Sequence, residues 1–197
     1  RSYLQLPSTV HDSDLKTFIY RNSIAEVKKL SLQQSSSNEI VKSINNQKNS
    51  GDVWQYLLLM NEYNQLVAPP QDVWDYASYT NLLSMDTVKP FVIKCENLIS
   101  KSDDPFLQWR SLYLILRATH FHKYHSMAIT KFEKYNALIG HDNSLAQYWC
   151  EGVYAGALLR NKQEDKAIYY TARTFANCPD QQLQAMNTYL FSKRQWK

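Results

Sequence analysis

Residues 149–179 read WCEGVYAGALLRNKQEDKAIYYTARTFANCP, and this stretch has the pattern of two helices folded back on each other. Small and apolar residues dominate its first half, and the polar run 161–164 interrupts them before a second periodic segment begins. Pro179 then stops the second segment, because proline lacks a backbone N–H. The stretch therefore predicts an antiparallel helix pair, 144–161 and 164–177.

The residues before this stretch predict another antiparallel pair, over 105–139. Asp104 followed by Pro105 marks its start, because an aspartate side chain can accept N–H groups of the first turn and proline is tolerated at the first helical position. We expect the first helix to run to about Lys123. Gly140 suits the left-handed conformation in which many helices end.

A short sequence motif occurs twice further toward the N-terminus, as DVWQY at 52–56 and as DVWDY at 72–76, 20 residues apart. Each Asp can cap a helix, and each Trp enters the core within the first turn. The prolines at 69–70 separate the two copies. The repeated motif predicts helices over 53–66 and 72–84.

Other polar residues also provide helix starts. The expected caps are Asp12 or Ser13, the capping boxes Ser23 with Glu26 and Ser36 with Glu39, then Asp86, and Asp142 or Asn143. The polar run 33–38, QQSSSN, predicts a flexible link. We therefore expect N-terminal helices with this link over 1–50 and a helical-hairpin array over 51–197, which ends in a capping helix, 181–193.

The second helix of the opening stretch resembles that of a tetratricopeptide repeat. That family places a small Ala, an aromatic residue four positions later and a closing Pro in this helix. Ala167 and Pro179 match the pattern, whereas Thr171 stands where the aromatic residue is expected.

The preceding helix pair carries the same signature in Ala128 and Phe132, with Gly140 in place of the proline. Residues 128 and 167 are 39 positions apart, whereas the standard repeat has about 34 residues. The resemblance, which covers 105–193, is therefore to an elongated, degenerate form of the repeat.

This resemblance implies an all-α fold, in which antiparallel helical hairpins stack as an α-solenoid that is tetratricopeptide-like in the C-terminal half. It also implies a protein-binding scaffold without catalysis or cofactor. Such arrays bind partners on the inner face formed by the first helix of each pair. Tyr113, Arg117, Arg160 and Asn161 are therefore the candidate partner-binding residues.

Composition also favours a helical chain. Only 4 Gly and 6 Pro occur in 197 residues, which leaves little material for the tight turns of an all-β protein. The net charge of +4 falls short of the dense Lys and Arg clusters that make nucleic acid the first expectation. Trp54, Trp74, Trp109 and Trp149 stand near helix starts and are interpreted as core residues.

Cysteine usage indicates a reducing compartment. Cys95, Cys150 and Cys178 are odd in number and widely spaced, which argues against a disulfide framework or a zinc finger. No run is long and apolar enough for a membrane span. The first residues, RSYLQLPSTV, are neither a signal peptide nor an initiator Met, so we expect a piece of a longer, intracellular and cytoplasmic protein.

Three histidines form the sole local group of metal-ligand type. On a continuing helix His122 and His125 share a face while His120 points elsewhere, and no carboxylate or cysteine follows within a turn. Solvated or hydrogen-bonded histidines at a helix end are the favoured interpretation over a metal site. Gly152 and Gly156 indicate close helix packing rather than a membrane dimer motif.

Phosphate-loop, zinc-protease, hydrolase and kinase signatures do not occur in the sequence, so no enzyme is expected. The favoured hypothesis is a protein–protein interaction scaffold, a subunit or regulatory segment of a larger complex. An RNA-binding helical repeat is the alternative, because Tyr and Arg side chains can stack on bases. A ligand-binding or catalytic domain around the histidines is a third hypothesis.

Overall fold

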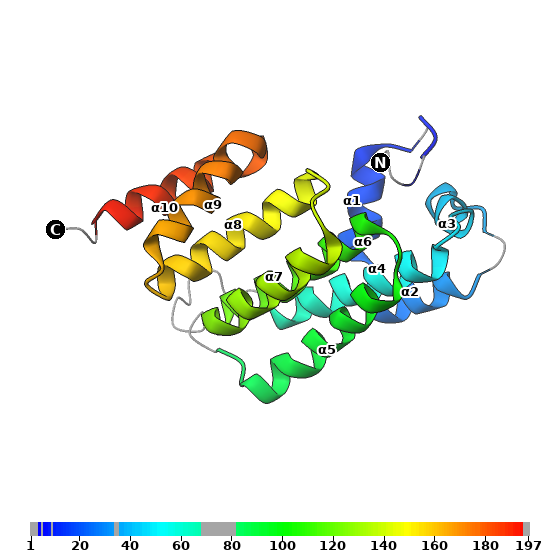
Figure 1. The fold of residues 1–197 in the computed structure, drawn as a ribbon. Coiled ribbons are helices and arrows are strands. Elements are labelled where there is room, and N and C mark those ends of the chain that lie inside the picture. The colour runs from blue at the N-terminus through cyan, green and yellow to red at the C-terminus, as the bar shows by residue number, and fades with distance from the viewer. Residues whose placement is uncertain (1–3, 5, 9, 34–35, 68–81, 195–197) are drawn as a thin grey trace, which may run out of the picture. The chain divides into compact units, whose positions relative to one another are not determined.

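A computed structural model shows an all-α protein, as expected (Figure 1). It describes residues 4, 6–8, 10–33, 36–67 and 82–194, with side chains described as far as Leu190. These residues form ten α-helices and no strand. The helices are α1 Asp12–Arg21, α2 Ile24–Ser31, α3 Glu39–Asn45, α4 Ser50–Leu66, α5 Met85–Lys101, α6 Pro105–Phe121, α7 His125–Ile139, α8 Leu145–Arg160, α9 Glu164–Asn177 and α10 Gln182–Arg194. A 3₁₀ turn, Pro179–Gln181, precedes α10.

The chain divides into two compact units, residues 1–68 and 69–197, rather than at the expected boundary of 50 and 51. Helix α4 belongs to the first unit, because it packs against α1, α2 and α3. The ring of Trp54 lies 6.2 Å from that of Phe18, and its Nε1 donates to Asn45 Oδ1 at 2.9 Å. Burial of Trp54 against the preceding helices thus moves the boundary to the end of α4.

Of the two capping boxes predicted in the first unit, one is present in the structure and one is not. At α2 the box is present, since Glu26 N donates to Ser23 Oγ at 3.2 Å and Ser23 N donates to Glu26 Oε2 at 2.6 Å. At α3 the predicted Ser36–Glu39 box is wrong. Asn38 directly precedes that helix, and its Oδ1 accepts from Ile40 N at 2.9 Å.

The helix expected over 72–84 lies largely outside the described residues, which resume at 82. Residues 82–84 are not helical, and α5 begins at Met85 with Ser84 rather than Asp86 as its cap residue. Asp86 instead lies in the first turn of α5, where its negative charge suits the positive end of the helix dipole.

Both predicted hairpins of the second unit are present. Asp104 caps α6 by accepting from Phe106 N at 2.9 Å, and Gly140 follows α7 with a φ of 78°. Helix α6 ends at Phe121, two residues before the expected Lys123. The cap of α8 is Ser144 rather than Asp142 or Asn143, because its Oγ accepts from Gln147 N at 3.2 Å.

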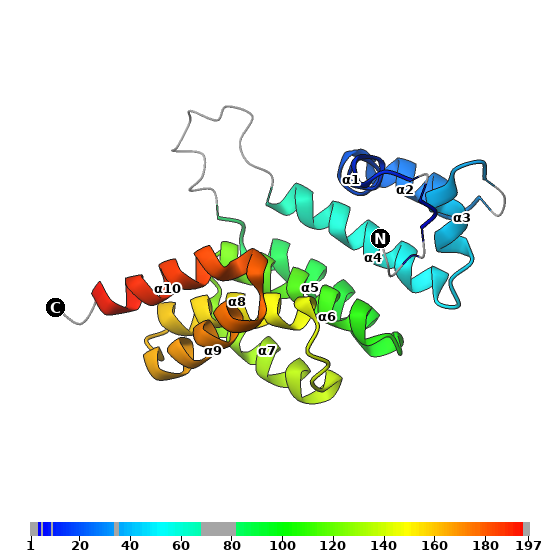
Figure 2. The same cartoon turned by 90° about the horizontal axis from the view of Figure 1, so that it is seen from above.

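The helices of the second unit pack in chain order and also across the chain. Helix α6 contacts α5, α7 and α8, and α8 contacts α7, α9 and α10. Figure 2 shows α10 alongside α9. The core includes Trp109, Phe132 and Leu158, all fully buried. Trp54 and Trp109 are core residues as expected, Trp149 is half-buried, and Trp74 lies outside the described residues.

Among the described helices, none combines the length and the apolar character required to cross a membrane.

Candidate functional site

The candidate partner-binding residues come from the two neighbouring helices α6 and α8. Tyr113 and Arg117 lie one turn apart on α6, and Arg117 Nη1 donates to Tyr113 Oη at 3.0 Å. Arg160 is the last residue of α8, and its charge acts on His120 together with that of Arg117. Asn161 follows Arg160 as the C-cap residue of α8, and its Oδ1 accepts from Ser126 Oγ of α7 at 3.4 Å.

Two histidines lie close enough to Arg160 to feel its charge. The rings of His120 and His125 are 4.9 Å apart, with their planes inclined by 54°. Burial, which is the largest cause, and repulsion of the imidazolium form by His125, Arg160 and Arg117 together lower the pKa of His120 to about 4. Burial and the charges of Arg160 and Lys123 also lower the pKa of His125. Both rings are therefore neutral at physiological pH.

The prediction that His122 and His125 share a helical face is wrong. Helix α6 ends at Phe121, and the chain turns through Lys123 with a φ of 65°, so helical spacing does not continue to His125. His122 is buried and its Nδ1 accepts from Leu83 N at 3.1 Å. Within the described part of the chain, no group of three His, Cys, Asp or Glu side chains is arranged to hold a metal ion.

Glycines on α8 allow close contact with its neighbours. A Cβ atom added to Gly156 would lie 3.3 Å from His120 Cε1, so the absent side chain makes room for the histidine ring. A Cβ atom added to Gly152 would lie 3.3 Å from Thr174 Cγ2 on α9. The two glycines serve close packing with two different helices, as the sequence indicates.

The face continues along α6 and α8 through two aromatic rings, each with an arginine against it. The rings of Tyr113 and Trp149 are 5.6 Å apart. The guanidinium carbon of Arg110 lies 4.9 Å from the centre of the Trp149 ring, and that of Arg117 lies 5.7 Å from the centre of the Tyr113 ring. We call these residues, with His120 and Arg160, the α6–α8 face.

Sequence reasoning missed Arg110 and Trp149 as members of this face. Their signal was present, because Arg110, Tyr113 and Arg117 follow the i, i+3, i+7 spacing of one helical stripe. Trp149 was assigned to the core because of its position near a helix start. The half-buried ring instead lies against Tyr113 and Arg110 of α6.

The charge of the face is positive. Helix α6 contains no Asp or Glu, and α8 contains one, Glu151. Glu151 is fully buried, so it adds no negative charge to the surface. Arg110, Arg117 and Arg160 are therefore the charged residues that α6 and α8 bring to the face.

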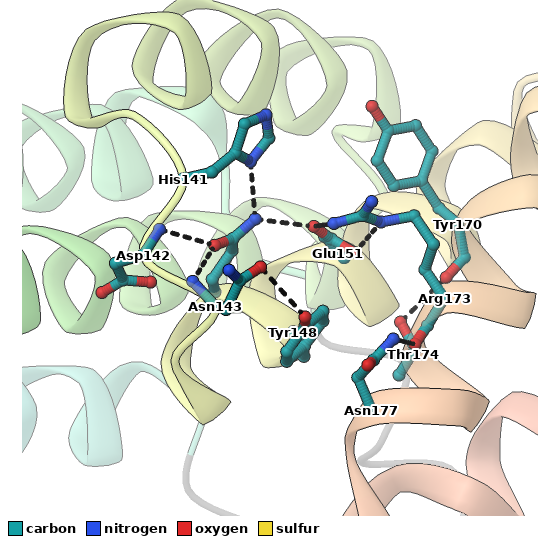
Figure 3. Close-up of polar contacts among 10 residues, drawn as sticks. His141, Asp142, Asn143, Tyr148, Glu151, Tyr170, Arg173, Thr174 and Asn177 are labelled. Atoms are coloured by element: carbon teal, nitrogen blue, oxygen red, sulfur yellow. Dashed lines mark hydrogen bonds and ion pairs between the residues drawn. The ribbon is translucent and has the colours of Figure 1, made fainter.

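Glu151 belongs to a separate buried network between α8 and α9 (Figure 3). Arg173 donates to both of its carboxylate oxygens, from Nε at 2.9 Å and from Nη2 at 3.0 Å. Gln147 Nε2 donates to the same carboxylate at 2.9 Å. These bonds to Glu151 raise the pKa of Arg173 further above its usual value. The carboxylate is thus paired and hydrogen-bonded, as a buried charge must be.

The same network holds the loop between α7 and α8. Gln147 Oε1 accepts from the backbone N of Asp142 at 3.1 Å and of Asn143 at 3.0 Å, and its Nε2 lies 2.8 Å from His141 Nδ1 (Figure 3). The hydrogen bonds of the network thus run from the loop to Gln147, from Gln147 to Glu151, and from Glu151 to Arg173 on α9. We interpret this network as a structural clamp. In the sequence, the feature that points to this network is Glu151, the one acid in an otherwise uncharged stretch of α8.

Comparison with known proteins finds no matching family model, no matching curated protein and no matching solved structure.

Proposed function

We propose that this chain is a protein–protein interaction scaffold, a subunit or regulatory segment of a larger intracellular complex, which binds its partner on the α6–α8 face. The observation that carries the proposal is the convergence of Arg110, Arg117 and Arg160 around two aromatic rings and a neutral histidine pair. Arginine and aromatic side chains are the residue types most enriched in the energetically important parts of protein interfaces.

The second unit is, in this proposal, a tetratricopeptide-like α-solenoid. Its support is that α6 and α8, the first helices of two successive pairs, contact each other as well as their own partners α7 and α9. The small signature residues Ala128 and Ala167 are both buried, which permits close approach of the paired helices. Phe132 stacks on Tyr154 with ring centres 4.1 Å apart, linking the two pairs.

A protein partner is favoured over RNA because the aromatic rings of the α6–α8 face already contact arginines and each other. Stacking on a base requires an open ring face. The Trp149 ring has Arg110 against it and the Tyr113 ring has Arg117, while the two rings also contact each other. The positive charge of the face still attracts phosphate, so RNA binding is the second candidate.

The proposed role involves no catalysis. Its support is that Glu151, the one acid of α8, is fully buried and held by Arg173 and Gln147, where a substrate has no access. The proposed setting is a reducing compartment. Cys95, Cys150 and Cys178 are buried thiols without a disulfide partner, which fits such a compartment.

Affinity capture with three forms of the 197-residue chain tests this function. The wild type is compared with the double variant Arg117→Glu/Arg160→Glu and with Lys89→Glu, a single charge reversal at an exposed residue of α5. We expect the wild type and Lys89→Glu to retain a stable protein partner from native extract, and the double variant to lose it. Recovery of no partner, or of the same partner by all three forms, overturns the proposal.

A titration with single-stranded RNA separates the second candidate from the first. RNA binding predicts an affinity that falls steeply with salt and is lost in the double variant but not in Lys89→Glu. Protein binding predicts no such affinity for the wild type.

A further inference from the structure

Helices α9 and α10 form an apolar groove on the second unit. Its volume is about 250 Å³. Ile168, Ala172 and Phe175 line it from α9, and Ala185, Met186 and Tyr189 line it from α10. None of these residues belongs to the α6–α8 face, so the groove is a separate surface.

An exposed apolar stripe runs along α10 beside the groove. Leu183, Met186 and Leu190 are 76%, 44% and 47% exposed. Their i, i+3, i+7 spacing places them on one face of the helix. An exposed apolar patch of this kind marks an interaction surface, because leaving it in water costs the free energy that burial would supply.

Equivalent grooves within the same unit are covered by a helix. Helix α7 packs on α6 and reaches α5, where Lys131 Nζ and Tyr135 Oη each donate to Glu96 Oε1 at 2.7 Å. Helix α9 packs on α8 and reaches α7, where the Tyr170 ring lies 5.7 Å from the Phe132 ring. The α9–α10 groove is the next in this series, and none of the helices described in this unit lies over it.

The absence of charged side chains from most of α10 indicates which kind of partner can occupy this groove. Residues 182–192 contain no Asp, Glu, Lys or Arg, although 20% of the chain is charged. Two copies of this uncharged segment, which covers α10 up to Lys193 and Arg194 at its end, can therefore approach each other without local charge repulsion. The stripe of Leu183, Met186 and Leu190 supplies apolar side chains at the spacing needed for helix packing.

We propose that a second copy of this chain covers the groove, with α10 of each copy seated between α9 and α10 of the other. The two helices run antiparallel about a two-fold axis, which makes the interface self-complementary. Met186 lies near the middle of the stripe, so the two Met186 side chains meet close to the axis. The dimer leaves the α6–α8 face of each copy for its own partner.

Sedimentation velocity of the 197-residue chain over a range of concentrations tests the dimer. The expected mass rises from 23.1 kDa toward twice that value as concentration increases. Met186→Glu places two like charges at the axis and is expected to raise the dissociation constant by at least about tenfold. Gln184→Glu adds the same charge on the polar side of α10 and is expected to leave the dimer unchanged.

Cysteine cross-linking locates the contact without weakening it. Met186→Cys is expected to form a disulfide-linked dimer under mild oxidation, and Gln184→Cys, on the other side of α10, is not. The three native cysteines are buried, so they should not contribute cross-links of their own. If Met186→Glu fails to fold, the comparison of Met186→Cys with Gln184→Cys still tests the dimer. A chain that stays monomeric at every concentration overturns the proposal. A dimer that Met186→Glu leaves intact, or equal cross-linking at both positions, also overturns it.

Discussion

Glu151 is 0% exposed on α8, a helix in which apolar and small residues predominate. Arg173 and Gln147 satisfy its carboxylate, and the same Gln147 holds the loop at Asp142 and Asn143. The sequence marks this residue as an isolated acid among apolar neighbours. Its partner on α9 depends on the angle between two helices, so the spacing in the sequence does not identify it.

Arg173→Met is expected to lower the free energy of unfolding by about 3 kcal/mol, because it leaves the buried carboxylate of Glu151 without its cation. Glu151→Gln combined with Arg173→Met should recover most of that loss, since no buried charge remains. Urea denaturation of both variants measures the difference. A single variant that loses less than about 1 kcal/mol would show that Glu151 is not held in this way.

The histidine pair makes stability depend on pH in a defined window. The pKa of His120 is about 4 in the folded chain and 6.5 in the unfolded chain. The unfolded state therefore binds more protons between these values, and stability falls as pH drops from about 6.5 to about 4. We expect the loss to be about 3 kcal/mol in wild type and smaller in His120→Gln, measured by urea denaturation across this range. The same slope in both forms would contradict the assignment.

At the scale of helices, local signals were enough for the hairpins of the second unit. Asp104, Pro105 and the apolar stripes gave α6 to α9 within two residues, because caps and periodicity act over a single turn. The histidine arrangement was missed because a positive φ at Lys123 breaks the helical spacing. A turn of that kind has no strong signal when the residue is not glycine.

Gly156→Leu is expected to destabilise the second unit by about 1–3 kcal/mol, because a Cβ atom there already lies 3.3 Å from His120. Gly51→Ala on α4 is the control. No atom lies within 4 Å of its added Cβ, so the change should be neutral or stabilising by up to about 1 kcal/mol. Thermal unfolding followed by circular dichroism compares them. Equal effects at both positions would show that α6 and α8 are not in close contact at Gly156.

At the scale of the whole molecule, the all-α class could be predicted from composition and pattern, and the division into units could not. Low glycine and proline content and helical periodicity are properties of the chain itself. The boundary depends on α4 packing against α1, α2 and α3, which are contacts between separate helices. No sequence signal near residue 50 reports them.

Residues 69–197 produced alone are expected to fold, because Trp109, Phe132 and Leu158 of the core all belong to that unit. The expected result is a helical circular dichroism spectrum and a cooperative urea transition. Residues 51–197, the originally expected array, provide the comparison and should gain no cooperativity from α4. Loss of the cooperative transition in 69–197 alone would show that α4 is part of the same folding unit.

The most direct measurement of the central claim is photo-cross-linking from the α6–α8 face. Phe121 lies one turn after Arg117 on α6 and is 40% exposed, so a photoreactive phenylalanine analogue at this position reports what binds there. Tyr169 on α9, at 57% exposed, carries the same analogue as the control. We predict a covalent adduct with a single protein from native extract at position 121 and none at 169. Cross-linking to RNA alone, or equal protein adducts from both positions, would contradict a protein partner on this face.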